Sequence, residues 1–151
     1  MILAALHRYF YPSSEELHMT QELERADLAG LAERYSAAWI ARDVDGVVAL
    51  HTPESLFVSH GRPQTARGHE ALRTAFSDVF ETYPQFGVDT HRLLFGDTHW
   101  VLDWTLSFEP PGQARRGFRC VDVVEVSDGL VARKDTYVDT AEARTAVRSA
   151  Q

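Results

Sequence analysis

Three ionisable side chains that could carry out acid–base chemistry, Asp122, Arg133 and Asp135, lie close together in the stretch CVDVVEVSDGLVARKDTYVD, residues 120–139. Apolar and polar residues alternate on both sides of Asp128-Gly129, and an Asp-Gly pair flanked by such runs is a strong signal for a two-residue hairpin loop. A two-residue loop sets the register of the strands and places Asp122 opposite Asp135. The sequence therefore predicts a β-hairpin with two facing carboxylates and a guanidinium one step along.

Side chains directly opposite each other in a hairpin share a face, with Cβ atoms about 5 Å apart. At that range in a dry site two carboxylates cannot both ionise freely, so we expect one raised pKa while Arg133 keeps the other group charged. This pairing supplies an acid and a base together. The predicted face consists of Cys120, Asp122, Val124, Val126, Val131, Arg133, Asp135 and Tyr137. The alternative is that this face lies in solvent as an ordinary ion-pair ladder, while the valine-rich opposite face packs inward.

The elements around the hairpin follow from the apolar spacing. Residues 21–42 carry a helical stripe, residues 42–51 predict a short helix capped by Asp43 or Asp45, and residues 68–84 predict a third helix. Strands are expected at 54–61, 86–95, 98–109, 115–126 and 130–139. Helices followed by a run of antiparallel strands predict an α+β fold with a pocket between helices and sheet.

Composition narrows the function. The formal net charge of −7 disfavours nucleic-acid binding, and no apolar run approaches the length of a membrane span. A single cysteine and the lack of a signal-peptide pattern predict a cytoplasmic location. His51, His69, His91 and His99 show no metal-ligand spacing and are expected at the surface or partly buried, so no metal is predicted.

Several separated segments resemble one family in the right order: ERYSAAWIARDVDGVVALHTPESLFVS, ARGHEALRTAF, WTLSFEPPG and DVVEVSDGLVARKDTYVD. They resemble the nuclear transport factor 2-like superfamily, and more closely its ketosteroid isomerase-like and SnoaL-like (polyketide cyclase-like) branches. The resemblance implies a cone, in which a curved antiparallel sheet wraps around three N-terminal helices. It divides the chain into an N-terminal extension (1–21), a SnoaL-like domain (22–140) and a C-terminal tail (141–151).

The resemblance also implies roles for single residues. Tyr35 matches the oxyanion-donating tyrosine of ketosteroid isomerases, and Asp122 matches their protonated aspartic acid. Their base aspartate falls on Ser59, with His60 beside it, so steroid isomerisation by that route is not expected. Asp135 lies on the strand that supplies the acid/base aspartate of SnoaL-like cyclases.

We therefore expect a SnoaL-like, cofactor-free acid/base enzyme of the isomerase, cyclase or dehydratase type. Its substrate would be a small apolar or aromatic oxygenated molecule such as a polyketide or terpenoid. The expected catalytic residues are Asp135, Asp122, Arg133 and Tyr35, and the expected substrate-binding residues are Trp39, Ser59, His60, Trp104 and Tyr137.

Two alternatives remain. One is an epoxide hydrolase, since Asp122, Arg133 and Asp135 resemble the Asp–Arg–Asp group of limonene-type enzymes, and the other is a non-catalytic binding domain. The superfamily hosts many activities, so the resemblance alone does not choose between them. A homodimer through the outer sheet face is expected. Which face of the strand at 98–109 lines the pocket stays open.

Overall fold

The computed structural model describes residues 12–63 and 65–148. Two helices come first, a third interrupts the early strands, and the remaining strands follow in sequence. In chain order the elements are α2 (Ser14–Ile40), α3 (Val44–Ala49), β1 (His51–His60), β2 (Thr65–Arg67), α4 (Gly68–Thr82), β3 (Gly87–Phe95), β4 (His99–Phe108), β5 (Arg116–Ser127), β6 (Leu130–Val138) and α5 (Thr140–Arg148). The expected helices-then-sheet order is confirmed.

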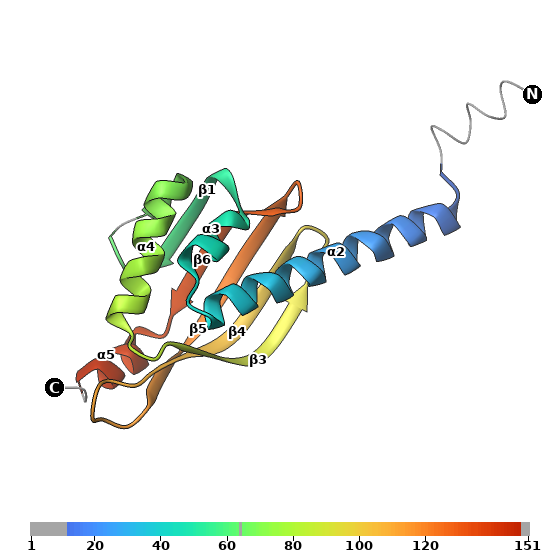
Figure 1. Cartoon of the computed structure of the whole chain (residues 1–151). Coiled ribbons are helices and arrows are strands. Elements are labelled where there is room, and N and C mark those ends of the chain that lie inside the picture. Colours follow the sequence, from blue (N-terminus) through green and yellow to red (C-terminus); the bar gives the residue numbers. More distant parts are fainter. Residues whose placement is uncertain (1–11, 64, 149–151) are drawn as a thin grey trace, which may run out of the picture.

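The long helix α2 begins at a capping box. The Ser13 hydroxyl accepts the Glu16 backbone N–H, and the Glu16 carboxylate accepts the Ser13 N–H. The helix then continues through the boundary expected after residue 21, and its N-terminal part projects beyond the sheet (Figure 1). Its buried side chains begin only at Leu28 and form one stripe: Leu28, Leu31, Ala32, Tyr35 and Trp39. The second half of α2 therefore carries the contact with the core.

The six strands form one sheet in the order β2-β1-β6-β5-β4-β3. All neighbouring strands are antiparallel except β1 and β6, which run parallel. The sheet curves without closing, and α2, α3 and α4 lie over its concave face (Figure 1). The α+β cone predicted from the sequence is confirmed.

The β5–β6 hairpin begins as predicted and then departs from the predicted register. Asp128 and Gly129 both have positive φ, as a tight two-residue turn requires, and Val126 faces Val131. A β-bulge at Ala132 then shifts the pairing by one residue, so that Glu125 faces Arg133 and Asp122 faces Thr136. Because sides alternate along a strand, this slip turns every later β6 side chain to the other face.

The predicted pairing of Asp122 with Asp135 is therefore wrong. Asp122 shares its face with Lys134 and Thr136, whereas Arg133 and Asp135 lie on the convex face. The two acids expected to couple are separated by the sheet itself.

Two further elements were not expected. The short strand β2 pairs antiparallel with β1, and α5 (Thr140–Arg148) lies beside β5 in a region that was, from residue 141 on, expected to be a tail. None of the helices described within residues 12–63 and 65–148 is long and apolar enough to cross a membrane.

Candidate functional site

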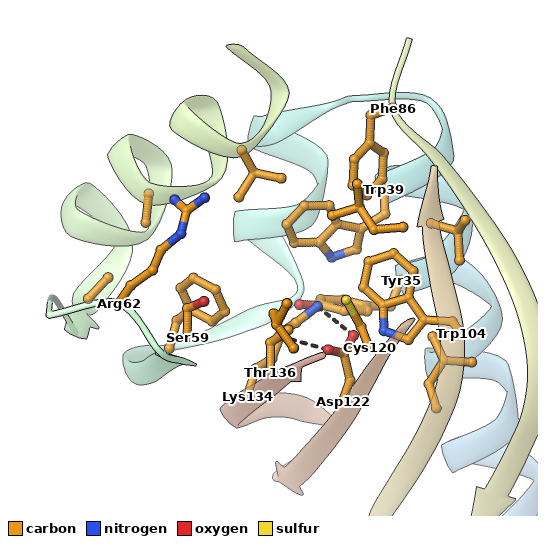
Figure 2. A pocket seen from close by; sticks show the side chains of 18 of the residues that line it. Tyr35, Trp39, Ser59, Arg62, Phe86, Trp104, Cys120, Asp122, Lys134 and Thr136 are labelled. Carbon is orange, nitrogen blue, oxygen red and sulfur yellow. Dashed lines mark hydrogen bonds and ion pairs between the residues drawn. The ribbon is translucent and has the colours of Figure 1, made fainter. Parts of the chain in front are cut away.

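A cavity of about 830 Å³ lies between the helices and the concave face of the sheet. Such a volume is typical of small-molecule sites. α2 and α4 form one side, and β1, β4, β5 and β6 form the other (Figure 2). The wall is largely aromatic and aliphatic: it includes Trp39, Phe57, Phe86, Trp100, Leu102, Trp104, Leu106 and Phe118. The inward face of β4, left open by the sequence, is the one with Trp100 and Trp104.

The structure brings together five of the residues predicted to form the site. Tyr35, Trp39, Ser59, Trp104 and Asp122 all line the cavity. They come from α2, β1, β4 and β5, so the fold assembles them from four separate elements.

The other four predicted residues do not line the cavity. Asp135, Arg133, His60 and Tyr137 form a cluster on the convex face. Arg133 donates to both oxygens of Asp135, at 2.6 and 3.0 Å, and His60 Nε2 lies 2.8 Å from Asp135 Oδ1. The His60 ring stacks on Tyr137 at 4.0 Å. The Arg133 guanidinium, with help from His60, holds the pKa of Asp135 below its usual range.

The polar centre of the cavity is an ion pair between Asp122 and Lys134. Lys134 Nζ lies 3.0 Å from Asp122 Oδ2, and the Thr136 hydroxyl donates to Asp122 Oδ1 at 2.7 Å (Figure 2). The side chains of Lys134 and Asp122 are only 6% and 4% exposed. Both carboxylate oxygens of Asp122 thus accept hydrogen bonds. Asp122 is thus positioned as a hydrogen-bond acceptor, in contrast to the donor expected by resemblance.

Lys134 is a cation inside an aromatic environment. Its ammonium lies 4.5 Å from the centroid of the Trp39 ring and 5.4 Å from that of Tyr35. Burial is the largest single influence and by itself would lower the pKa of Lys134. The charge and hydrogen bond of Asp122, together with the nearby Tyr35 and Cys120, outweigh it, so the pKa is raised overall. Lys134 therefore remains charged and keeps N–H donors beyond the one that Asp122 accepts.

Behind Tyr35 runs a buried chain of hydrogen bonds. The Tyr35 hydroxyl lies 3.0 Å from His51 Nε2, and His51 Nδ1 lies 2.7 Å from the Ser55 hydroxyl. Burial, with the nearby positive charge of Lys134, lowers the pKa of His51 to about 3, so this imidazole is neutral. Burial also raises the pKa of Tyr35, so its hydroxyl keeps its proton. These hydrogen bonds hold the Tyr35 oxygen in place at the cavity wall.

Two buried indole N–H groups have no protein acceptor. Among the described residues, Trp39 Nε1 and Trp104 Nε1 are the buried side-chain polar atoms without a hydrogen-bond partner. Both side chains line the cavity (Figure 2). An unpartnered buried donor is costly, so these groups favour a bound molecule that carries acceptor oxygens.

Sequence reasoning missed Lys134 and His51. Strict alternation from the turn at Asp128-Gly129 would place Lys134 on the face opposite to Asp122, and alternation carries no sign of the bulge. His51 was grouped with the surface or partly buried histidines. The signal that could have found His51 is its position. It lies between the apolar helix α3 and the body of β1, two elements that both pack against the core.

Comparisons with known proteins identify the family and support the fold. The family model of the SnoaL-like domain matches residues 32–134. A search of curated proteins finds no match. Among solved structures, the fold is similar to a protein from Jannaschia sp. CCS1 proposed to be a SnoaL-like polyketide cyclase, with 20% identity, TM-score 0.70 and coverage of 81% of this chain and 92% of that one.

Two further structures share the fold. An LEH-like epoxide hydrolase of M. tuberculosis has 21% identity and TM-score 0.67, covering 82% of this chain and 91% of that one. TerC, crystallised with polyporic acid, has 16% identity and TM-score 0.69, covering 81% of this chain and 98% of that one. With the cone, the cavity and the family match together, the chain belongs to the SnoaL-like domain family.

Proposed function

We propose that this protein is an acid/base enzyme that binds a small, largely apolar, oxygenated molecule in the cavity and moves protons on it. The reaction would be an isomerisation, cyclisation or dehydration beside a carbonyl group. The observation that carries the proposal is the Asp122–Lys134 pair, a proton acceptor and a cation 3.0 Å apart within an apolar cavity.

The pair can act on the carbon next to a carbonyl group. The Asp122 carboxylate takes a proton from that carbon, and the C–H electron pair becomes a C=C bond while the carbonyl electrons move to oxygen. The negative charge that develops on this oxygen is stabilised by the Lys134 ammonium and by nearby N–H and O–H donors. The proton now on Asp122 then completes one of three reactions. It returns to another carbon of the enolate, it neutralises the alkoxide formed when the enolate carbon attacks a second carbonyl, or it protonates a hydroxyl on the β-carbon, which leaves as water as the enolate collapses to the unsaturated carbonyl.

The environment of the pair suits this chemistry. Each Asp122 oxygen accepts one hydrogen bond and keeps a further lone pair, so the carboxylate can still receive a proton. Lys134 has a flexible four-carbon stem, which allows its ammonium to follow charge from Asp122 to the substrate oxygen. The low-polarity wall strengthens both interactions compared with water.

The cavity wall supports a flat, apolar substrate with oxygen acceptors. Aromatic rings make up much of the lining, and the unpartnered N–H groups of Trp39 and Trp104 can only donate. A ketone, quinone or lactone oxygen would satisfy them, whereas a hydrocarbon would leave them unpaired.

An epoxide hydrolase built on Asp122, Arg133 and Asp135 is not supported by this geometry. That mechanism needs the three groups in one cavity, and the bulge places Arg133 and Asp135 on the convex face. Similarity to the mycobacterial epoxide hydrolase extends to the fold alone.

The test uses β-tetralone, an apolar bicyclic ketone with exchangeable protons beside its carbonyl. The protein is incubated with the ketone in D₂O, and deuterium incorporation is followed by NMR. We expect exchange faster than in buffer, and loss of that excess in Asp122→Asn. Asp135→Asn is the matched control, the same chemical change on the convex face, and should retain the full rate.

Binding is measured separately from exchange. β-Tetralone should bind more tightly than its hydrocarbon analogue tetralin. Trp104→Phe should weaken the binding of the ketone more than the binding of the hydrocarbon. Ketone binding without any exchange would identify a non-catalytic binding domain and overturn the enzymatic proposal. Exchange that survives Asp122→Asn and is lost in Asp135→Asn would move the chemistry to the convex face.

A further inference from the structure

The solvent-facing side of α2 carries a second apolar stripe, directly opposite the one that packs on the core. Its members recur at alternating intervals of four and three residues, the spacing of a helix–helix seam. They are Met19, Leu23, Ala26, Gly30, Ala37 and Ile40, with Glu33 as the charged member of the series. We call this set the outer stripe.

The outer stripe is exposed and has no partner in the described part of the chain. Met19, Leu23 and Ile40 are 59%, 64% and 58% exposed. The N-terminal part of this helix projects past the sheet (Figure 1). A projecting helical segment without tertiary contacts is marginal in water, so a helix that packs against it would stabilise it.

The residues that flank the outer stripe indicate the partner and its direction. Asp27 and Arg34 lie on the same side of the stripe, seven residues apart, and neither forms an ion pair with a described residue. In an antiparallel pair centred near Gly30, Asp27 of each helix faces Arg34 of the partner subunit. A parallel pair would instead place Glu22 near Asp27 of the partner subunit, which brings like charges together.

The centre of the stripe is shaped for a close approach. Gly30 and Ala26 are small and lie between the larger Leu23 and Ile40. When two such helices pack antiparallel, large residues lie beside small ones and acidic residues beside basic ones. The surface is therefore complementary to a second copy of itself.

We propose that the outer stripe binds the α2 helix of a second copy of this chain, packed antiparallel about Gly30. This contact is independent of the proposed function, and it is distinct from the pairing through the outer sheet face, which stays a prediction. It would form an isologous dimer.

The first experiment measures the mass of the full chain by size-exclusion chromatography with light scattering. We expect a dimer at micromolar concentration, and Leu23→Glu should raise its dissociation constant roughly a hundredfold. Leu17→Glu is the matched control, because Leu17 is also 49% exposed on the projecting segment but lies off the outer stripe. It should leave the dimer intact.

Charge exchange and crosslinking test the direction. Asp27→Arg alone should weaken the dimer, and adding Arg34→Asp should restore it. Since Cys120 is buried and is the sole cysteine, Gly30→Cys should crosslink two subunits through its new thiol, whereas Ala37→Cys should not. A Cβ at Gly30 would meet only the flexible tip of Arg34, at 3.4 Å, so that variant should fold.

Three outcomes would overturn the proposal. The first is a monomeric wild-type chain, which would also result if residues 1–11 covered the stripe. The second is a dimer that withstands Leu23→Glu but dissociates on Tyr137→Glu, which would place the interface on the sheet. The third is a crosslink through Ala37→Cys as efficient as that through Gly30→Cys, which would indicate parallel helices.

Discussion

Lys134 Nζ lies 3.0 Å from Asp122 Oδ2, across two neighbouring strands and beneath the indole ring of Trp39. Both side chains are almost completely withdrawn from water, and each is the other's only charged partner in the described part of the chain. The pair is therefore at once the reactive centre we propose and a stability risk, because either charge alone would be stranded in an apolar cavity.

Removing one charge should destabilise the fold strongly. Lys134→Met leaves the Asp122 carboxylate buried without its cation, and we expect the free energy of unfolding to fall by about 3–5 kcal/mol. The double variant with Asp122→Asn should recover most of that loss, because no charge then remains buried. Urea denaturation at neutral pH measures all three proteins, and a single variant as stable as the wild type would show that the pair is not closed to water.

The pH dependence of stability should report on His51. Its pKa is about 3 in the folded protein and near 6.5 when unfolded, so the folded state binds fewer protons in between. The contribution of His51 to the free energy of unfolding is therefore fully present above pH 6.5. It is lost as the pH falls below that value, by up to about 1.4 kcal/mol per pH unit. The lowered pKa values of Asp103 and Asp135 act in the same direction, but only at more acidic pH, near the ordinary carboxyl pKa of 3.8.

His51→Gln should therefore flatten the loss of stability between about pH 6 and pH 4.5, a window above the carboxylates. Urea midpoints across this range give the comparison. Parallel curves for the two proteins would mean that His51 takes up a proton in the folded state.

Tyr35→Phe tests the hydrogen-bond chain behind the cavity wall. The change keeps the ring, which packs edge-on against Trp39 and Trp100, but removes the hydroxyl bonded to His51 Nε2. We expect stability to fall by about 1–2 kcal/mol, since a buried imidazole nitrogen is left unpaired.

The same variant should slow deuterium exchange into β-tetralone by about 10–100-fold if the Tyr35 hydroxyl supports the substrate oxygen. NMR of the exchange reaction and urea denaturation separate the two effects. An unchanged exchange rate with reduced stability would leave Tyr35 a purely structural role.

Cys120 should be inert although it lines the cavity. Burial, reinforced by the Asp122 charge, raises the pKa of its thiol to about 12, so almost no thiolate exists at pH 8. Labelling by an aromatic disulfide reagent should be about 1,000-fold slower than for the same chain in denaturant. Rapid labelling of the native protein would indicate that the cavity opens widely and frequently.

Much of the architecture follows from local patterns. The apolar spacing of α2, the Asp43 cap of α3 and the alternation of β3 to β6 all match observed elements. These features depend on residues near one another in the chain, and so does the turn at Asp128-Gly129, which places Ser127 opposite Leu130 as predicted. The positions of Tyr35, Trp39 and Asp122 at the cavity follow from the same patterns together with the family resemblance.

The sequence by itself thus determined the order of the elements, the cone through its family resemblance, and one member, Asp122, of the pair that we propose to be reactive. Only the tertiary structure decided which β6 residue meets Asp122, because a single extra residue at Ala132 exchanges the two faces of the strand. The alternation of residue types does not reveal that extra residue, because both faces of 133–138 carry charged and polar groups. Which face points into the cavity depends on how β6 fits between β1 and β5. Burial of the Lys134 stem among Tyr35 and Trp39, with its charge met by Asp122, is a long-range consequence of that fit.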